Sequence, residues 1–315
     1  MVFRGSLGFT VLICFMTGSE ILAQQNTLMT QYMFNNFAFN PASAGSSEGI
    51  NATGWLRQQW IGFKDDEGNK IAPVTYYVSV DAPIRILRGG AGLSIYSDQL
   101  GFFRNIGLNL GYAYRMDLGP GDFSAGITLD VLNTRIDFAK FKPIDEDDPL
   151  LNDKSEKSDL VVDFSLGAGY RIPDRFYVSV SATQIAQTKA KKLYYQLKRH
   201  YYLTAGYNWP IPGHPMFEIQ PSVLVQTDGA AFQFDIDALL IYNKKFWGGI
   251  GYRYQDAVSV LAGVNIKGLR VGVSYDISTS ELTHYNSGSV EVFISYLFKL
   301  KVEKYRKSYR NTRFL

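Results

Sequence analysis

The sequence has little of what disulfide-rich or helical membrane proteins need. Only one cysteine occurs in 315 residues, which excludes a disulfide scaffold. Charged residues make up 19% of the chain, and no stretch holds the roughly 18 consecutive apolar residues that a membrane-spanning helix requires. Aromatic residues and glycine are abundant instead, with 21 Tyr, 21 Phe and 29 Gly. This composition favours many short strands over a helical bundle.

The first residues have the pattern of a secretory signal peptide. An apolar run is followed by a short segment that ends in Ala23, directly before the polar Gln24. Cleavage after Ala23 would leave a mature chain without cysteine, because Cys14 lies in the apolar run. A lipoprotein is the alternative, but Ile13 is not the small residue that lipid processing needs. We therefore expect residues 1–23 to be a signal peptide.

An alternation of period two dominates the rest of the chain. Between residues 106 and 117, every second residue is large and apolar, and the residues between them are polar or small. Because successive side chains of a strand point to opposite faces, this pattern predicts a strand with one apolar face. The same pattern recurs and predicts about 14 strands, near residues 50–60, 71–83, 89–98, 103–117, 121–135, 160–172, 175–184, 199–209, 216–227, 230–243, 246–254, 257–267, 268–278 and 289–301.

The connections between these strands alternate in length. Tight Gly, Pro or Asp turns join the strands at one end, and the long connections all fall at the other end, at residues 61–70, 137–158, 185–198 and 278–288. An even strand number, short turns at one end and an aromatic excess are typical of bacterial outer-membrane barrels, whose short turns face the periplasm. The predicted fold is therefore all-β, a transmembrane antiparallel β-barrel of about 14 strands with an N-terminal plug-like segment.

A motif set before and within the first strands resembles a known family. Residues 24–49 do not alternate, and they are rich in aromatic residues and Asn, with a turn at Asn40-Pro41. The motif residues are Gln31, Tyr32, Asn36, Asn40, Pro41, Ala42, Gly45, Arg57, Trp60, Gly62, Asp98 and Gly101. In this combination the chain resembles the PorP/SprF family, outer-membrane proteins of the type IX secretion and gliding system of Bacteroidetes. The resemblance extends from about residue 31 to residue 298.

The resemblance implies a protein without catalytic activity that works by binding. It implies an accessory outer-membrane component of type IX secretion that assists export of a secreted adhesin or holds it at the surface. The expected partners are the C-terminal domain of the cargo, periplasmic components of type IX secretion, and outer-membrane lipid and lipopolysaccharide. The alternative is a porin or substrate-specific channel, with lumen residues such as Asp130, Asp163, Asp235, Asp237, Arg115 and Arg253 along a diffusion path.

Two segments outside the predicted barrel at 50–301 have roles that the pattern leaves open. Residues 24–49 are a periplasmic or plug segment, or an ordinary tether that fixes the first strand. We expect Trp60 with Arg57, and Tyr32 with Asn40-Pro41, to close the periplasmic side. The tail at 302–315 belongs to a basic stretch from Lys299, with seven Lys and Arg against one Glu. Strand parity places this tail in the periplasm.

Features that could support catalysis or metal binding are weak. His284 is followed by Ser287 in a polar loop, but the arrangement lacks a companion motif for a nucleophile and its base. The acidic run from Asp145 to Asp148 lacks the order and the glycine of an EF-hand. We expect no catalytic residues, no metal site, no cofactor and no nucleic-acid partner.

Overall fold

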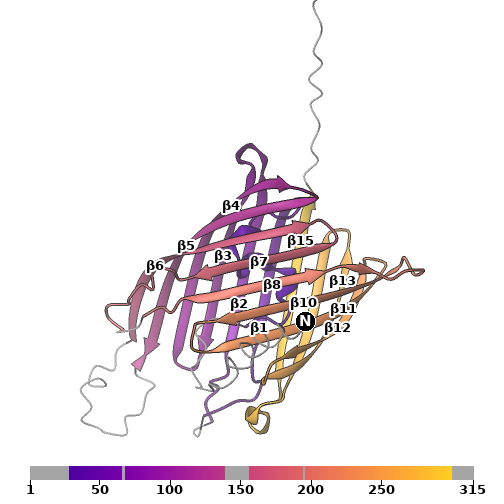
Figure 1. The fold of residues 1–315 in the computed structure, drawn as a ribbon. Coiled ribbons are helices and arrows are strands. Elements are labelled where there is room, and N and C mark those ends of the chain that lie inside the picture. Colours follow the sequence, from indigo (N-terminus) through magenta and orange to yellow (C-terminus); the bar gives the residue numbers. More distant parts are fainter. Residues whose placement is uncertain (1–27, 66–67, 139–155, 194–195, 300–315) are drawn as a thin grey trace, which may run out of the picture.

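The computed structural model describes residues 28–65, 68–138, 156–193 and 196–299 of the chain. Within these residues, fifteen strands form one antiparallel sheet (Figure 1). They are β1 (Gly49–Gln58), β2 (Val74–Ile84), β3 (Gly89–Leu100), β4 (Phe103–Leu118), β5 (Gly121–Asp137), β6 (Glu156–Ile172), β7 (Phe176–Thr183), β8 (His200–Tyr207), β9 (Trp209–Pro210), β10 (Phe217–Thr227), β11 (Phe232–Tyr242), β12 (Phe246–Arg253), β13 (Ala257–Ile266), β14 (Leu269–Ser278) and β15 (Ser289–Lys299).

The sheet closes on itself. Apart from β9, each strand pairs with the strands before and after it in sequence, and β1 pairs with β15 from Gly49↔Lys299 to Gln58↔Val290. The two-residue strand β9 pairs only with β10, and β10 also pairs with β8 and β11. The ring therefore consists of fourteen full strands, as the sequence predicts, and β9 is a short addition. Closure leaves none of these strands with a free edge, the condition for strands in lipid.

The two ends of the barrel differ. The long connections at residues 59–73, 184–199 and 279–288 share one end, which we name the long-loop end. The short-turn end carries connections such as 119–120, 173–175 and 267–268, and both the start of β1 and the end of β15. Three short connections, at 101–102, 228–231 and 254–256, also lie at the long-loop end, so the predicted asymmetry holds for the long connections only. By the rule for such barrels, the short-turn end faces the periplasm.

Alternation assigns an outer and an inner face to each strand. Apolar side chains such as Leu110, Ile250 and Ile294 are 52–66% exposed in the isolated chain and form the outer, lipid-facing surface. The residues between them point inward, and most are glycine or polar, with a few buried aromatic and aliphatic residues such as Trp55 and Phe293. Strand β14 is an example, because Val273 points outward and Ser274 is buried inside.

Several predicted features fall on residues that the structure does not describe. The signal peptide at 1–23, the acidic run at 145–148 and the tail at 302–315 lie outside the described residues. Among the residues that are described, no helix is long or apolar enough to cross a membrane.

Candidate functional site in the barrel lumen

Residues 28–48, named here the lumen segment, precede β1 and fold into three short 3-10 helices. These are η1 (Tyr32–Phe34), η2 (Asn36–Ala38) and η3 (Pro41–Ser43). The third helix begins where sequence rules place a helix start: the Asn40 side chain accepts a hydrogen bond from the backbone N–H of Ala42 at 2.8 Å, and Pro41 occupies the first helical position. The Asn-Pro-Ala motif therefore fixes a local turn.

The lumen segment contacts the inner face of strands around the ring. Its residues touch β14 and β15 through Thr30, β3 and β4 through Phe37, β5 through Ala42, and β6 and β7 through Asn40. Because these contacts come from strands on different sides of the ring, the segment lies inside the barrel. Its side chains are mostly buried, and Tyr32 has no exposed surface.

Inward-facing glycines make room for the segment. A Cβ atom built on Gly92 would lie 2.6 Å from the Phe37 ring, and one on Gly111 would lie 2.9 Å from it. A Cβ atom on Gly126 would lie 2.5 Å from the backbone N of Ala42. Glycine within a strand often marks a place where another chain segment approaches closely. These glycines therefore have a packing role, because a larger residue at these positions would collide with the lumen segment.

The segment runs along the length of the lumen. Its first residues reach Glu291, close to the start of β15 at the long-loop end. Its last residues lie at the short-turn end, where the Gly45 N–H donates to Asp81 at 3.0 Å and Arg115 donates to the Gly45 carbonyl oxygen at 2.8 Å. Gly45 has a φ of +61°, which favours glycine.

Two motif residues lie at the opposite end from the one expected. Arg57 and Trp60 come at the end of β1, next to the β14–β15 connection, so they belong to the long-loop end. The expectation that they close the periplasmic side is wrong. A strand of ten residues carries the chain from one end of the barrel to the other, so residues that follow β1 cannot stay where β1 begins.

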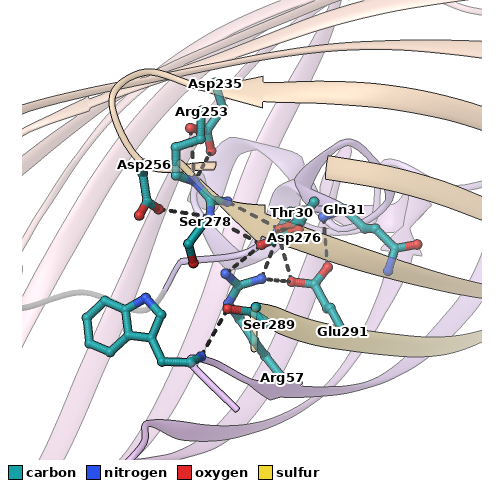
Figure 2. Close-up of polar contacts among 12 residues, drawn as sticks. Thr30, Gln31, Arg57, Asp235, Arg253, Asp256, Asp276, Ser278, Ser289 and Glu291 are labelled. Atoms are coloured by element: carbon teal, nitrogen blue, oxygen red, sulfur yellow. Dashed lines mark hydrogen bonds and ion pairs between the residues drawn. The ribbon is translucent and has the colours of Figure 1, made fainter. Parts of the chain in front are cut away.

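The first residues of the lumen segment are held by a buried charge cluster. We use this name for Thr30, Arg57, Asp235, Arg253, Asp276 and Glu291, which Figure 2 shows converging from several strands. The Glu291 carboxylate accepts the backbone N–H groups of Thr30 and Gln31, both at 2.8 Å. The hydroxyl of Thr30 donates to Asp276 at 2.7 Å and accepts from Arg57 at 2.9 Å.

Ion pairs tie the cluster together across the closure of the ring. Arg57 pairs with Asp276 at 2.8 Å and with Glu291 at 3.1 Å. Arg253 pairs with Asp235 at 3.1 Å and with Asp276 at 3.4 Å. All five charged side chains are nearly inaccessible to solvent. Removing one partner of a buried ion pair leaves an uncompensated buried charge. The cluster therefore holds the segment strongly only when all of its charged members are present.

Next to the charge cluster, aromatic side chains pack against one another in the lumen. Phe34 of the lumen segment stacks on Phe293 at 5.0 Å between ring centroids and lies 4.6 Å from Trp247. Phe293 stacks in turn on Trp55 at 5.3 Å. Such offset pairs add to the stabilisation that burial provides. Together, the charge cluster and the aromatic stack fill the lumen on the side of β12 to β1.

The remaining motif residues have local structural contacts. Asn36 accepts two backbone N–H groups at its carbonyl, from Phe39 and Asn40. Asp98 accepts a hydrogen bond from Thr75 at 2.6 Å, and Gly101 has a φ of +56° in the β3–β4 turn.

The turn that follows β1 contains Trp60 and Gly62. Both residues have positive φ, +51° and +86°, which turns the chain sharply beyond β1. The structure therefore separates the motif into a lumen group, with Gln31 to Gly45 and Arg57, and a long-loop group.

Sequence reasoning missed Thr30 and two carboxylates of the charge cluster, those of Asp276 and Glu291. Both carboxylates lie on the inward face of an alternating strand. A carboxylate among small polar residues on that face was the sequence signal that could have identified them. Arg253 and Asp235 were expected to line the lumen, which they do, but as buried ion-pair partners.

A cavity of about 120 Å³ remains beside the segment, on the side of β2 to β8. Phe37 and Phe39 of the lumen segment line one side, and Asp98, Asp130 and Asp163 belong to its wall. The β7–β8 connection folds over it, since the Asp163 carboxylate accepts the backbone N–H groups of Ala186 and Thr188. Among the described parts of the chain, no group of three or more His, Cys, Asp or Glu residues is placed to hold a metal ion.

The geometry defines a class: a closed outer-membrane β-barrel whose lumen holds a segment of its own chain. The chain belongs to the PorP/SprF family of type IX secretion system membrane proteins, whose family model matches residues 21–296. Its outer-membrane location and its place in type IX secretion follow from this membership and from the barrel fold.

Solved structures with a similar fold are also outer-membrane barrels. The toluene transporter TbuX of Ralstonia pickettii is 12% identical, with a TM-score of 0.55 over 86% of this chain and 94% of that one. The CymD monoaromatic hydrocarbon channel is 11% identical, with a TM-score of 0.54 over 89% of this chain and 95% of that one. At this identity the likeness concerns the fold alone. A search of curated proteins found no match.

Proposed function

We propose that this protein is an accessory component of type IX secretion that binds a partner adhesin and assists its export or its retention at the surface. The observation that carries the proposal is the occupied lumen. The lumen segment is held by Glu291 at the long-loop end and by Asp81 and Arg115 at the short-turn end. A lumen that the lumen segment occupies from the long-loop end to the short-turn end favours binding of a partner over passage of solutes.

The long-loop end offers an ordered surface for the cargo. The Ile61 N–H donates to the Gly288 carbonyl oxygen at 2.7 Å, and the Ser287 N–H donates to the Ile61 carbonyl oxygen at 2.7 Å. These bonds join residues 59–65 to residues 279–288, and we name the pair of loops the outer rim. Tyr285 on this rim is 69% exposed. We assign to the outer rim the contact with the C-terminal domain of the adhesin, and to the short-turn end the contact with periplasmic secretion components.

Surface display of the adhesin tests this assignment. Tyr285→Ser removes an exposed aromatic group from the outer rim, and Tyr254→Ser, at the same end but outside the rim, removes a 40% exposed tyrosine as a matched control. We expect Tyr285→Ser to lower the amount of adhesin on intact cells and its co-purification with the barrel, at an unchanged level of barrel in the outer membrane. If both variants display and bind the adhesin like the parent protein, the outer rim is not the cargo site.

The cavity beside the segment supports a second candidate, a diffusion channel. Its carboxylates at Asp98, Asp130 and Asp163 would give the path a preference for cations. This candidate predicts ion conductance by the intact protein without any partner, and the binding proposal predicts none.

A further inference from the structure

A second cavity, of about 280 Å³, lies at the short-turn end of the lumen. Strands β1, β13, β14 and β15 and the lumen segment contribute to its wall. The polar lining consists of Ser47, Asn51, Asn265, Arg270, Ser295 and Lys299. Two of these side chains are cations, and the described residues that line the cavity include no carboxylate. The cavity is therefore positively charged.

Arg270 is the unusual member of this wall. It follows Leu269 at the start of β14 and points inward, because its neighbours at alternate positions, Gly272 and Ser274, are on the inner face. Its guanidinium lies 5.1 Å from the centre of the Phe34 ring. It makes no hydrogen bond or ion pair with any residue that the structure describes.

Other lumen arginines in the described chain are paired. Arg57 and Arg253 bind carboxylates in the charge cluster, and Arg115 binds carbonyl oxygens of the lumen segment. A guanidinium has five N–H donors, and the half-buried side chain of Arg270 gives none of them to a described residue. An oxyanion would satisfy them, since the planar fork of arginine matches the oxygens of carboxylate and phosphate groups.

The neighbours of Arg270 suit the same ligand. Lys299 adds a second positive charge, and Asn265 and Ser47 add an amide and a hydroxyl donor. One residue of this wall contacts a carboxylate: Asn51 donates to Asp81 at 3.2 Å. Asp81 is itself held by the Gly45 N–H. Arg270 and Lys299 line the cavity, and among the described residues neither forms an ion pair with this carboxylate.

We propose that this cavity is an oxyanion-binding site that opens to the periplasm. Because its lining points into the lumen, the ligand comes from the aqueous side rather than from lipid. Two sources share this chemistry: free phosphate, and the carboxylate of an acidic periplasmic polypeptide. The proposal goes beyond the cargo role at the outer rim and does not depend on it.

Calorimetric titration of the full-length protein in detergent micelles tests the site. The probes are inorganic phosphate and a hexaglutamate peptide, each at the same ionic strength in chloride. Arg270→Gln removes the proposed ligand group, and Arg104→Gln removes an exposed arginine near the long-loop end with the same change of charge. We expect Arg270→Gln to weaken binding about tenfold or more, since hydrogen bonds to charged groups contribute strongly. Arg104→Gln should bind like the parent protein.

The two probes separate the sources. Binding of phosphate without the peptide indicates a free ion, and binding of the peptide in competition with phosphate indicates an acidic polypeptide. The proposal is overturned if neither probe binds the parent protein at millimolar concentration, or if both variants bind alike.

Stability measurements separate a ligand group from a structural one. If Arg270 binds an anion, phosphate raises the unfolding midpoint of the parent protein and not that of Arg270→Gln, because a ligand stabilises only the state that binds it. If Arg270 only holds Phe34 through its ring contact, the variant loses the same stability with and without phosphate. That second result would contradict the proposal.

Discussion

Loss of Arg57 should release the lumen segment while the barrel stays intact. Arg57 pairs with Asp276 and Glu291 and donates to Thr30, and all of these groups are buried. Arg57→Met leaves two carboxylates without this cation in a site that water barely reaches. Breaking buried ion pairs in this way costs about 3–5 kcal/mol. Since about 1.4 kcal/mol is a factor of ten, the population with a detached segment should rise by about 10²-fold to about 4 × 10³-fold.

A cysteine at Met33 can report this detachment. Met33 lies in the lumen segment and is 7% exposed, and Cys14 falls within the predicted signal peptide. Maleimide labelling of Met33→Cys should be slow in the parent background and faster by the factor above with Arg57→Met. The exposed Arg104→Met serves as the control. Equal labelling rates in the two arginine variants would refute the role of the charge cluster as the anchor of the segment.

Two further substitutions test the packing and the orientation of the strands. Gly92→Ala should lower the free energy of unfolding by about 1–3 kcal/mol through overpacking against Phe37, whereas Gly54→Ala, whose Cβ would have an ordinary 3.5 Å neighbour, should stay near the parent value in urea. Leu110→Arg, on the lipid face, should cost about 2–4 kcal/mol in vesicles if it lies near mid-bilayer, and Asn109→Arg should cost less because it lines the cavity. Equal losses of stability at positions 110 and 109 would contradict the assigned lipid-facing and lumen-facing sides.

The strands were predictable because each side of the barrel wall has a different solvent. Lipid outside and a polar lumen inside impose a period of two on residues such as Leu108 and Leu110, and this signal needs no knowledge of long-range contacts. Strand ends were less predictable: β6 begins at Glu156, four residues before its expected start, because its pairing with β5 continues to Asp137.

The interior could not be predicted in the same way. Arg57 and Glu291 stand directly opposite each other only because β1 pairs with β15, and this register is set by closure of the whole ring. The path of the lumen segment could be predicted only in outline. The sequence left open a plug in the barrel, a periplasmic element and a simple tether, whereas in the structure packing of Phe34 and Phe37 on the inner wall carries the segment along the lumen.

Ion conductance in a planar bilayer tests the central claim most directly, namely that the lumen segment occupies the barrel and leaves binding as its task. The purified full-length protein is compared with a variant that lacks residues 31–45, both inserted without partners. The account predicts no stable conductance steps for the full-length protein and clear steps for the deletion variant. Equal steps from both proteins would contradict it.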